Sequence, residues 1–230
     1  MATASATASA NGFAFERRIG HILNELKAAM AKADETTAMV VRDEQQIRDF
    51  FNEQSLNGVD HMIQVQISDG QHLFLLQEKW KLLTNQREVS QFLDCCARIL
   101  ARMPDYKGKI HRLWVSRTVP SINGDKSLQE GQTVVIQTCT SQTLLAMNTL
   151  LTICDLLEPE GATEYRQMAL GIIGRLGSLL PNAEEAIADP KAANADPKPE
   201  EGTFEPVSNF GEKRVLPITK QTVVMVKKVN

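Results

Sequence analysis

Three polar residues of this chain stand at spacings that suit metal-assisted hydrolysis of a phosphodiester. Asp60 opens one strand-like run, and Gln77 and Lys79 lie one residue apart on the next. Side chains alternate across a strand, so Gln77 and Lys79 share a face, and a hairpin would bring Asp60 beside them. Carboxylate and amide oxygens are ligands for Mg²⁺ or Mn²⁺, and an ammonium group can orient a water or offset charge on a phosphate. We expect these three side chains to form a catalytic cluster.

Two glutamates are further candidates for this cluster. Strict alternation points Glu78 away from Lys79, but a β-bulge would reverse that, so Gln77 is the preferred metal ligand and Glu78 the alternative. Glu16 lies in a helical pattern near the N-terminus. It could reach the site, or it could be a first-turn acid favoured by the helix dipole. Asp60 could instead cap a turn, and Lys79 could be a surface side chain with a buried aliphatic stem.

Two strands must position these residues. Residues 59–67 alternate between a mainly apolar face and a polar face that carries Asp60. The apolar face is expected to hold Val59, His61, Ile63, Val65 and Ile67. A hairpin is expected at 68–71, followed by a second strand over 72–81. Because the second strand has apolar residues on both faces, it is predicted to be buried on both sides and central in its sheet.

Helices and further strands surround this hairpin. Helical spacing of apolar residues predicts helices over 13–30, 43–52, 85–103, 141–157 and 163–180. Other strands are expected over 37–41, 110–119 and 133–138, with a loop over 120–132. The last helix carries Gly171, Gly174 and Gly177 on roughly one face. No strand precedes these glycines, so they are interpreted as a close helix-packing surface rather than a dinucleotide-binding loop.

The order of these elements and their motifs resembles a known superfamily. Gly58-Val59-Asp60 on the first strand and Gln77-Glu78-Lys79 on the second resemble the PD-(D/E)xK nucleases. The variant most similar is that of the Mrr-like restriction endonucleases, whose tripeptide is Gln-x-Lys. Residues 15–23 are similar to the first helix of that group, where a Glu often reaches the site, and residues 89–93 to the helix after the tripeptide. The resemblance covers about residues 13–140.

This resemblance implies an α/β fold with a restriction-endonuclease-like mixed central sheet flanked by helices. It also implies a Mg²⁺- or Mn²⁺-dependent endonuclease acting on DNA, with Asp60, Gln77, Lys79 and Glu16 as its catalytic residues. Gln77 stands where most relatives carry an acid, which should weaken metal binding. The alternative is therefore a catalytically degenerate nuclease fold that acts as a binding or structural module in a larger assembly. An unrelated α/β domain is a third possibility.

The charge distribution adds candidate contacts to nucleic acid. Residues 34–78 are mainly acidic and residues 79–118 mainly basic, whereas the net charge of −3 says nothing about partners. Two solvated faces of opposite sign are the alternative interpretation. The residues expected to contact nucleic acid are Gln91, Lys81, Arg87, His111 and Arg112. An aromatic content of 5% argues against a stacking platform for single strands.

One domain, residues 13–181, is expected between less ordered segments. Residues 1–12 are low in complexity and typical of a disordered tail, and residues 182–212 form an acidic Pro/Ala-rich linker. Residues 213–230 are β-prone and could be an edge strand or a tail that docks on a partner or protomer. Nucleases that cut both strands often pair, so a homodimer is a further expectation.

The cysteines and the N-terminus indicate the compartment. Cys95, Cys96, Cys139 and Cys154 have no zinc-site spacing and are expected to be buried, reduced thiols. The N-terminus lacks the basic and apolar regions of a secretory signal, and no stretch reaches the roughly 18 apolar residues of a membrane span. The expectation is an intracellular protein, cytoplasmic or nuclear, that is neither secreted nor embedded in a membrane.

Overall fold

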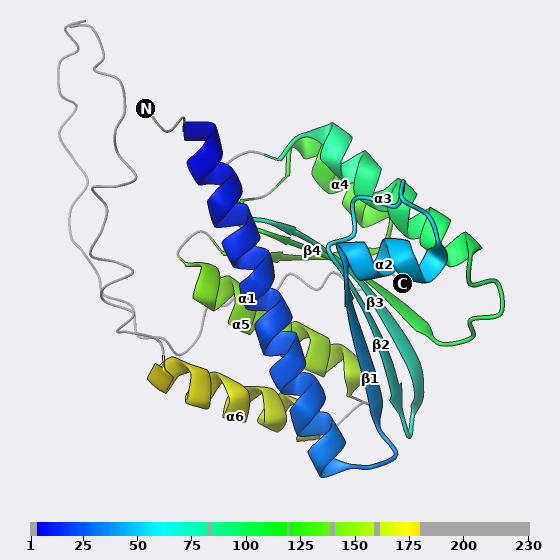
Figure 1. The fold of residues 1–230 in the computed structure, drawn as a ribbon, viewed down its shortest axis with the longest axis vertical. Helices are drawn as coiled ribbons and strands as arrows, with labels where there is room; N and C mark the ends of the chain where they lie inside the picture. The colour runs from blue at the N-terminus through cyan, green and yellow to red at the C-terminus, as the bar shows by residue number, and fades with distance from the viewer. Residues whose placement is uncertain (1–3, 82–83, 119, 139–140, 159–161, 180–230) are drawn as a thin grey trace, which may run out of the picture. The chain divides into compact units, whose positions relative to one another are not determined.

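A five-stranded mixed sheet in the order β1-β2-β3-β4-β5 forms the centre of the fold (Figure 1). The structure is a computed structural model that describes residues 4–81, 84–118, 120–138, 141–158 and 162–179. The strands are β1 (Ala38–Asp43), β2 (His61–Ile67), β3 (Gly70–Lys79), β4 (Lys109–Ser116) and β5 (Thr133–Gln137). β1, β2 and β3 pair antiparallel, whereas β4 and β5 run parallel to β3. The predicted mixed α/β fold, with a central sheet flanked by helices, is confirmed.

β3 is the middle strand and is buried on both faces, as predicted from its sequence. Phe74 and Leu76 point into one hydrophobic core, and Leu73 and Leu75 point into the other. None of these four side chains is exposed to solvent. This alternation continues to the end of the strand, so neighbouring polar residues there are also directed to opposite faces of the sheet.

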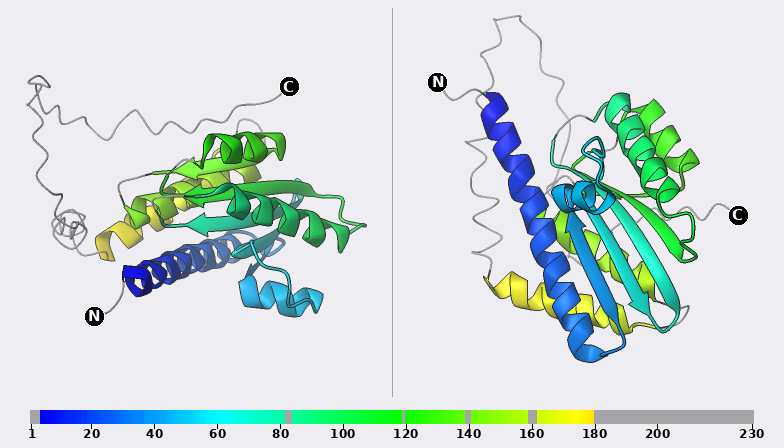
Figure 2. Two further views of the ribbon diagram at one scale, coloured as in Figure 1. Left: turned by 90° about the horizontal axis from the view of Figure 1, so that it is seen from above. Right: turned by 45° about the vertical axis from the view of Figure 1, so that its right-hand side comes forward.

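In the described part of the chain, three helices cover each face of the sheet. The first face packs against α1 (Ala4–Ala33), α5 (Gln142–Leu157) and α6 (Glu164–Leu179). The second packs against α2 (Glu44–Phe51), α3 (Gln86–Ala101) and α4 (Ile122–Glu130). α1 runs across its face of the sheet as a long diagonal, and α3 and α4 lie side by side (Figures 1 and 2). The site described below depends on where α1 crosses the sheet.

Side-chain caps fix the start of the helices nearest the site. Asp43 caps α2 by accepting a hydrogen bond from the Gln46 backbone N–H at 2.8 Å. Asn85 caps α3 in the same way, accepting from the Glu88 N–H at 3.0 Å, and the Glu88 side chain reaches back to the Asn85 N–H. Such reciprocal capping satisfies backbone donors that the helix itself leaves unpaired, so these helices begin at defined residues.

Two helices differ from the sequence prediction. α1 begins at Ala4, so residues 4–12, predicted as a disordered tail, are helical. Adding alanine-rich residues to an existing helix requires no new nucleation, and this favours extension. Residues 122–130, predicted as a loop because of Asn123-Gly124, form α4, in which the Ser121 hydroxyl accepts from the Gly124 N–H. The residues that begin this helix, Ser121 to Gly124, are of types that are also common in turns, so the sequence pattern did not distinguish the two.

Two predictions about side-chain packing were wrong. Val59 packs in the α2/α3/α4 core, not on the face it was expected to share with His61, because regular pleating begins only at His61. Gly171 and Gly174 are not a close-packing surface, since a Cβ added at either would meet no atom within 4 Å. The surroundings of Gly177 lie outside the described part of the chain.

The remaining expectations divide between described and undescribed residues. Cys95, Cys96 and Cys154 are buried free thiols, as expected, and Cys139 lies outside the described residues. Burial raises the pKa of the Cys95 thiol to about 11, so it is protonated at neutral pH. Within the described ranges, no helix is long and apolar enough to cross a membrane. The predicted linker, 182–212, and tail, 213–230, also fall outside the described residues.

Candidate active site

Asp60, Gln77 and Lys79 meet where β3 ends beside the start of β2. One oxygen of Asp60, Oδ2, accepts a hydrogen bond from the Glu78 backbone N–H at 2.6 Å and another from the Gln77 side-chain amide. The Lys79 ammonium lies 4.0 Å from the same oxygen. The Asp60 side chain is only 12% exposed and that of Lys79 is 24% exposed. The structure therefore brings together the three residues that strand alternation and the hairpin had predicted to be neighbours.

The turn before Asp60 depends on a glycine. Gly58 has a φ of +113°, in a region that side chains with a Cβ rarely adopt. A Cβ at this position would lie 2.9 Å from the Gln91 carbonyl oxygen of α3. The Gln91 side chain also donates a hydrogen bond to Asn57 at 3.0 Å, and the Asp60 N–H donates to the Leu76 carbonyl at 2.7 Å. α3 and β3 together therefore hold the chain so that the Asp60 carboxylate faces Gln77 and Lys79.

The Gln77 amide presents its nitrogen, not its oxygen, to Asp60. In this orientation an N–H donor satisfies the negative charge of the carboxylate. Rotation of the amide about its last side-chain bond would exchange the donor for a carbonyl oxygen, which is the atom that a hard cation accepts. Among the described residues, no group of three or more His, Cys, Asp or Glu side chains is arranged to hold a metal ion. Any cation here would therefore need the Gln77 oxygen or other oxygen donors.

Glu78 points to the opposite face of β3, toward α1, and pairs with a histidine. Its Oε1 lies 2.7 Å from Nδ1 of His61. The Glu78 side chain is fully buried and that of His61 is 8% exposed. Burial raises the pKa of Glu78. For His61, burial acts to lower the pKa, but the charge and hydrogen bond of Glu78 raise it to about 8. With a pKa of about 8, the His61 ring carries its proton at neutral pH beside the Glu78 carboxyl group.

Glu16 reaches this region from α1, the helix that crosses above it. Its pKa is raised to about 7 by partial burial, then by the charges of Asp60 and Glu78, with Lys79 and His61 acting in the opposite direction. Burial also raises the pKa of Asp60. Three carboxyl groups thus lie close enough to disfavour one another's ionised forms. Such a cluster favours an added proton.

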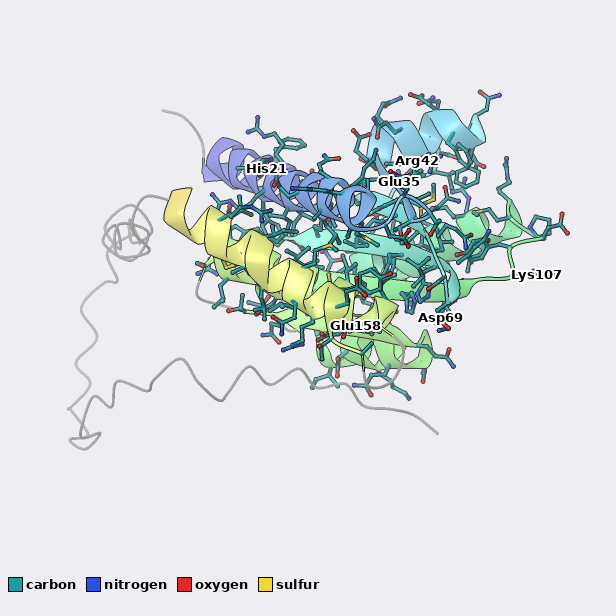
Figure 3. All side chains as sticks on the ribbon, turned by 90° about the horizontal axis from the view of Figure 1, so that it is seen from below. His21, Glu35, Arg42, Asp69, Lys107 and Glu158 are labelled. Atoms are coloured by element: carbon teal, nitrogen blue, oxygen red, sulfur yellow. The ribbon has the colours of Figure 1, made fainter. Side chains whose placement is uncertain are left out.

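Two clefts open beside Glu16. The larger, about 750 Å³, lies between α1 and the start of α2; its lining includes Arg17, His21, Glu44 and Asp60. The smaller, about 230 Å³, is lined by Phe13, Glu16, Lys79, Trp80, Lys81 and other residues. Figure 3 shows His21 on the outward side of α1 (Figure 3). The cluster is therefore accessible from two sides, although Asp60 itself is largely covered.

The residues predicted to contact nucleic acid are not all at this end of the sheet. Gln91 supports the turn before Asp60, Lys81 pairs with Glu88, and Arg87 is exposed on the first turn of α3. His111 instead pairs with Phe74 in the β3–β4 register, which is five residues from Lys79, or about 16 Å at 3.3 Å per residue. Arg112 donates to the Gly131 carbonyl at 2.6 Å. The structure does not bring His111 and Arg112 together with Asp60.

The sequence prediction missed the pairing of His61 with Glu78. One signal was present: Gly20 interrupts the pattern of the first helix. A Cβ on Gly20 would lie 3.1 Å from Nε2 of His61, so a glycine there lets α1 approach the start of β2 closely. Phe13 and Trp80, which line the smaller cleft, were also not predicted as site residues. Both features depend on a packing contact between segments far apart in the sequence.

Comparison with known proteins adds little to this geometry. No protein-family model matches the chain, and neither does any curated protein. Among solved structures, the chain is similar to the MspJI restriction endonuclease in complex with a 27-mer oligonucleotide, with 12% sequence identity and a TM-score of 0.34. The match covers 82% of this chain and 40% of that chain. A likeness of this size carries no argument about function, so function must be inferred from the site itself.

Proposed function

We propose that this chain is a metal-dependent nuclease that hydrolyses phosphodiester bonds in DNA. The observation that carries the proposal is the convergence of Asp60, Gln77 and Lys79 at the end of β3, with Glu16 near enough for the charges of Asp60 and Lys79 to act on its pKa. A carboxylate, an amide and an ammonium within one small site match the needs of phosphodiester hydrolysis. The reaction must activate a water and offset charge that develops on the phosphate.

Each residue has a distinct role in this proposal. Asp60, the Gln77 oxygen and Glu16 would hold Mg²⁺ or Mn²⁺, which would supply Lewis acidity when bound. Lys79 orients the attacking water and offsets negative charge on the phosphate. In the metal-free protein Glu16 has a pKa of about 7, so binding of a cation would displace its proton near neutral pH. The Glu78–His61 pair links the end of β3 to the start of β2 and so keeps Lys79 beside Asp60.

Cleavage assays on purified protein test the proposal directly. With Mg²⁺ or Mn²⁺ and mixed DNA substrates, Asp60→Asn and Lys79→Met should each lower the cleavage rate at least ~100-fold, because each removes a group used in the chemical step. Lys126→Ala is a suitable control, since Lys126 is a 76% exposed lysine on α4. Cleavage that survives both site substitutions would refute the assignment.

A second candidate function, a binding or structural module without catalysis, is favoured by one observation. Asp60 already accepts hydrogen bonds from Gln77 and from the Glu78 backbone, so its charge is compensated without a cation. Calorimetry with Mn²⁺ separates the two functions. A catalytic site should bind Mn²⁺, and Gln77→Glu should tighten that binding by adding a charged ligand. Absence of Mn²⁺ binding in both proteins would favour the module.

A further inference from the structure

The smaller cleft begins at the catalytic cluster and extends away from Asp60. Its volume is about 230 Å³, and Lys79 belongs to both the cluster and the cleft. One wall comes from the N-terminal half of α1, through Phe13 and Glu16, and the other from the residues that follow β3, Trp80 and Lys81. A group bound at Lys79 would therefore have its neighbouring group in this cleft.

Two aromatic side chains line the cleft. Phe13 is 63% exposed, which leaves most of a large apolar ring in contact with solvent at the cleft. Trp80 is half-buried and is held from two directions: its ring lies 5.7 Å from that of Phe15, and the Arg117 guanidinium lies 5.3 Å from its centroid. One ring is thus fixed by its neighbours and the other is exposed. Such a pair can accept a flat group by stacking.

The charged residues of the cleft are largely compensated. Lys81 forms an ion pair with Glu88. Glu78, which also lines the cleft, pairs with His61, which does not line it. Because these charges are already paired, they attract an anion only weakly. Lys79, at the boundary with the cluster, can contact an anion. The interior of the cleft suits a neutral, flat group, and its inner end suits an anion.

We propose that this cleft binds one unpaired base of the DNA strand whose phosphate faces Lys79. A nucleotide has both required parts, because its phosphate is anionic and its base is flat and uncharged. A base paired within a duplex is stacked on its neighbours, so it must be unpaired to enter the cleft. The site therefore selects single strands, flaps or distorted duplexes over matched duplex DNA. This inference rests on the proposed function in taking Lys79 to face a phosphate.

Binding measured without cleavage tests the inference. The full chain is titrated, in EDTA, into a single-stranded oligonucleotide that carries one 2-aminopurine, a fluorescent base whose emission falls when it stacks on an aromatic ring. The wild-type protein should quench the emission and should bind this strand more tightly than a matched duplex. Phe13→Ala should abolish most of the quenching and raise Kd about tenfold, as expected for one base–aromatic contact. Phe13→Tyr should retain the quenching and the wild-type Kd, because it keeps the aromatic ring.

A matched control is Phe50→Ala. Phe50 is 51% exposed on α2 and packs against Phe51 and under Arg42, so it is an exposed aromatic residue that is not part of this cleft. Phe50→Ala should leave Kd and quenching unchanged. The inference is overturned if Phe13→Ala binds and quenches like the wild type, if matched duplex is preferred, or if no oligonucleotide binds.

The outcomes also separate this inference from the proposed function. If quenching depends on Phe13 but no DNA is cut with Mg²⁺ or Mn²⁺, the base-binding cleft stands and the nuclease assignment fails. If cleavage depends on Asp60 and Lys79 but is indifferent to Phe13 and to strand pairing, the nuclease assignment stands and the base-binding cleft is refuted.

Discussion

The two ends of β3 bury ionisable groups on the same face of the sheet, yet the histidine pKa is raised at one end and lowered at the other. At one end Glu78 pairs with His61, with Glu16 nearby. At the other, about 20 Å away at 3.3 Å per residue, His72 lies 3.1 Å from His111. The His111 ring also stacks on Phe74, with their centroids 4.5 Å apart. Both ends are packed within the fold, so burial alone does not mark a functional site.

The difference lies in the charge of the neighbours. Burial lowers the pKa of His111 to about 4, and the positive charges of His72 and Lys109 add to the effect. Burial also lowers the pKa of His72. At the Glu78 end, the same burial acts on His61, but the carboxylates outweigh it. One end of the strand therefore retains a proton at neutral pH, and the other excludes it. Raised pKa values among grouped carboxyl groups are typical of functional sites, so the Glu78 end of β3 is the candidate.

Removing one partner of the buried His61–Glu78 pair should have the largest effect on stability. His61→Leu leaves the Glu78 carboxyl buried without its hydrogen bond, which should lower the free energy of unfolding by about 3–5 kcal/mol. The double variant His61→Leu/Glu78→Leu should recover much of that loss, because no unpaired polar group remains. Urea denaturation of the two single variants and the double variant measures the coupling.

The exposed ion pair at the opposite end of the sheet provides the control. Lys109 lies 2.9 Å from Asp69, and its side chain is 60% exposed. The hairpin bearing Asp69 is labelled at the end of the sheet away from His21 (Figure 3). Lys109→Ala should leave the unfolding free energy nearly unchanged. If His61→Leu is equally mild, the pair at the Glu78 end is not an important packing contact.

Glu16→Gln should stabilise the fold while impairing the proposed reaction. The folded protein raises the pKa of Glu16 from 4.5 to about 7, so ionised Glu16 disfavours folding as the pH rises through this range. Replacing it with a neutral amide should increase the free energy of unfolding at pH 8 by about 1 kcal/mol, a modest value because Glu16 is partly exposed to solvent.

Denaturation at pH 4 and pH 8 checks this expectation. The gain from Glu16→Gln should be present at pH 8 and should disappear at pH 4, where Glu16 is protonated in both the folded and unfolded chains. In the cleavage assay the same variant should lose activity, a trade of activity for stability that is common at functional sites. Equal stability of the two proteins at both pH values would contradict the crowding of carboxyl groups at this end.

Local sequence patterns were sufficient to predict the central part of the fold. The two apolar faces of β3 identified it as the middle strand, and the helical spacing of apolar residues over 85–103 identified α3, because both signals depend on residues close in sequence. α4 was missed for the same reason. Its Asn123-Gly124 dipeptide is typical of a turn, and few buried apolar residues, such as Leu128, mark it as a helix.

Only the part of the candidate site that is formed by the pairing of β2 with β3 could be predicted from the sequence. Alternation and the hairpin were enough to place Asp60 beside Gln77 and Lys79. The raised pKa of Glu16 and the cleft at Phe13 depend on where α1 crosses the sheet, and no short motif encodes that crossing. Charge was also a poor guide for His111, because a basic stretch of sequence does not specify which end of a strand each residue occupies.

A separate expected effect is the acid sensitivity that His111 confers at the end of the sheet away from the site. Its pKa falls from 6.5 in the unfolded chain to about 4 in the folded protein, so the unfolded state binds the proton more readily. The stability that neutral His111 provides is therefore present above pH 6.5 and is lost as the pH falls toward 4. His111→Phe keeps the stacking on Phe74 but removes the hydrogen-bond partner of His72 Nδ1, so it should cost about 1–3 kcal/mol at pH 7. The unfolding free energy of this variant should fall less steeply between pH 6.5 and 4 than that of the wild type. An unchanged slope would mean that His111 does not titrate differently in the two states, and the contrast between the two ends of β3 would then rest on the Glu78 end alone.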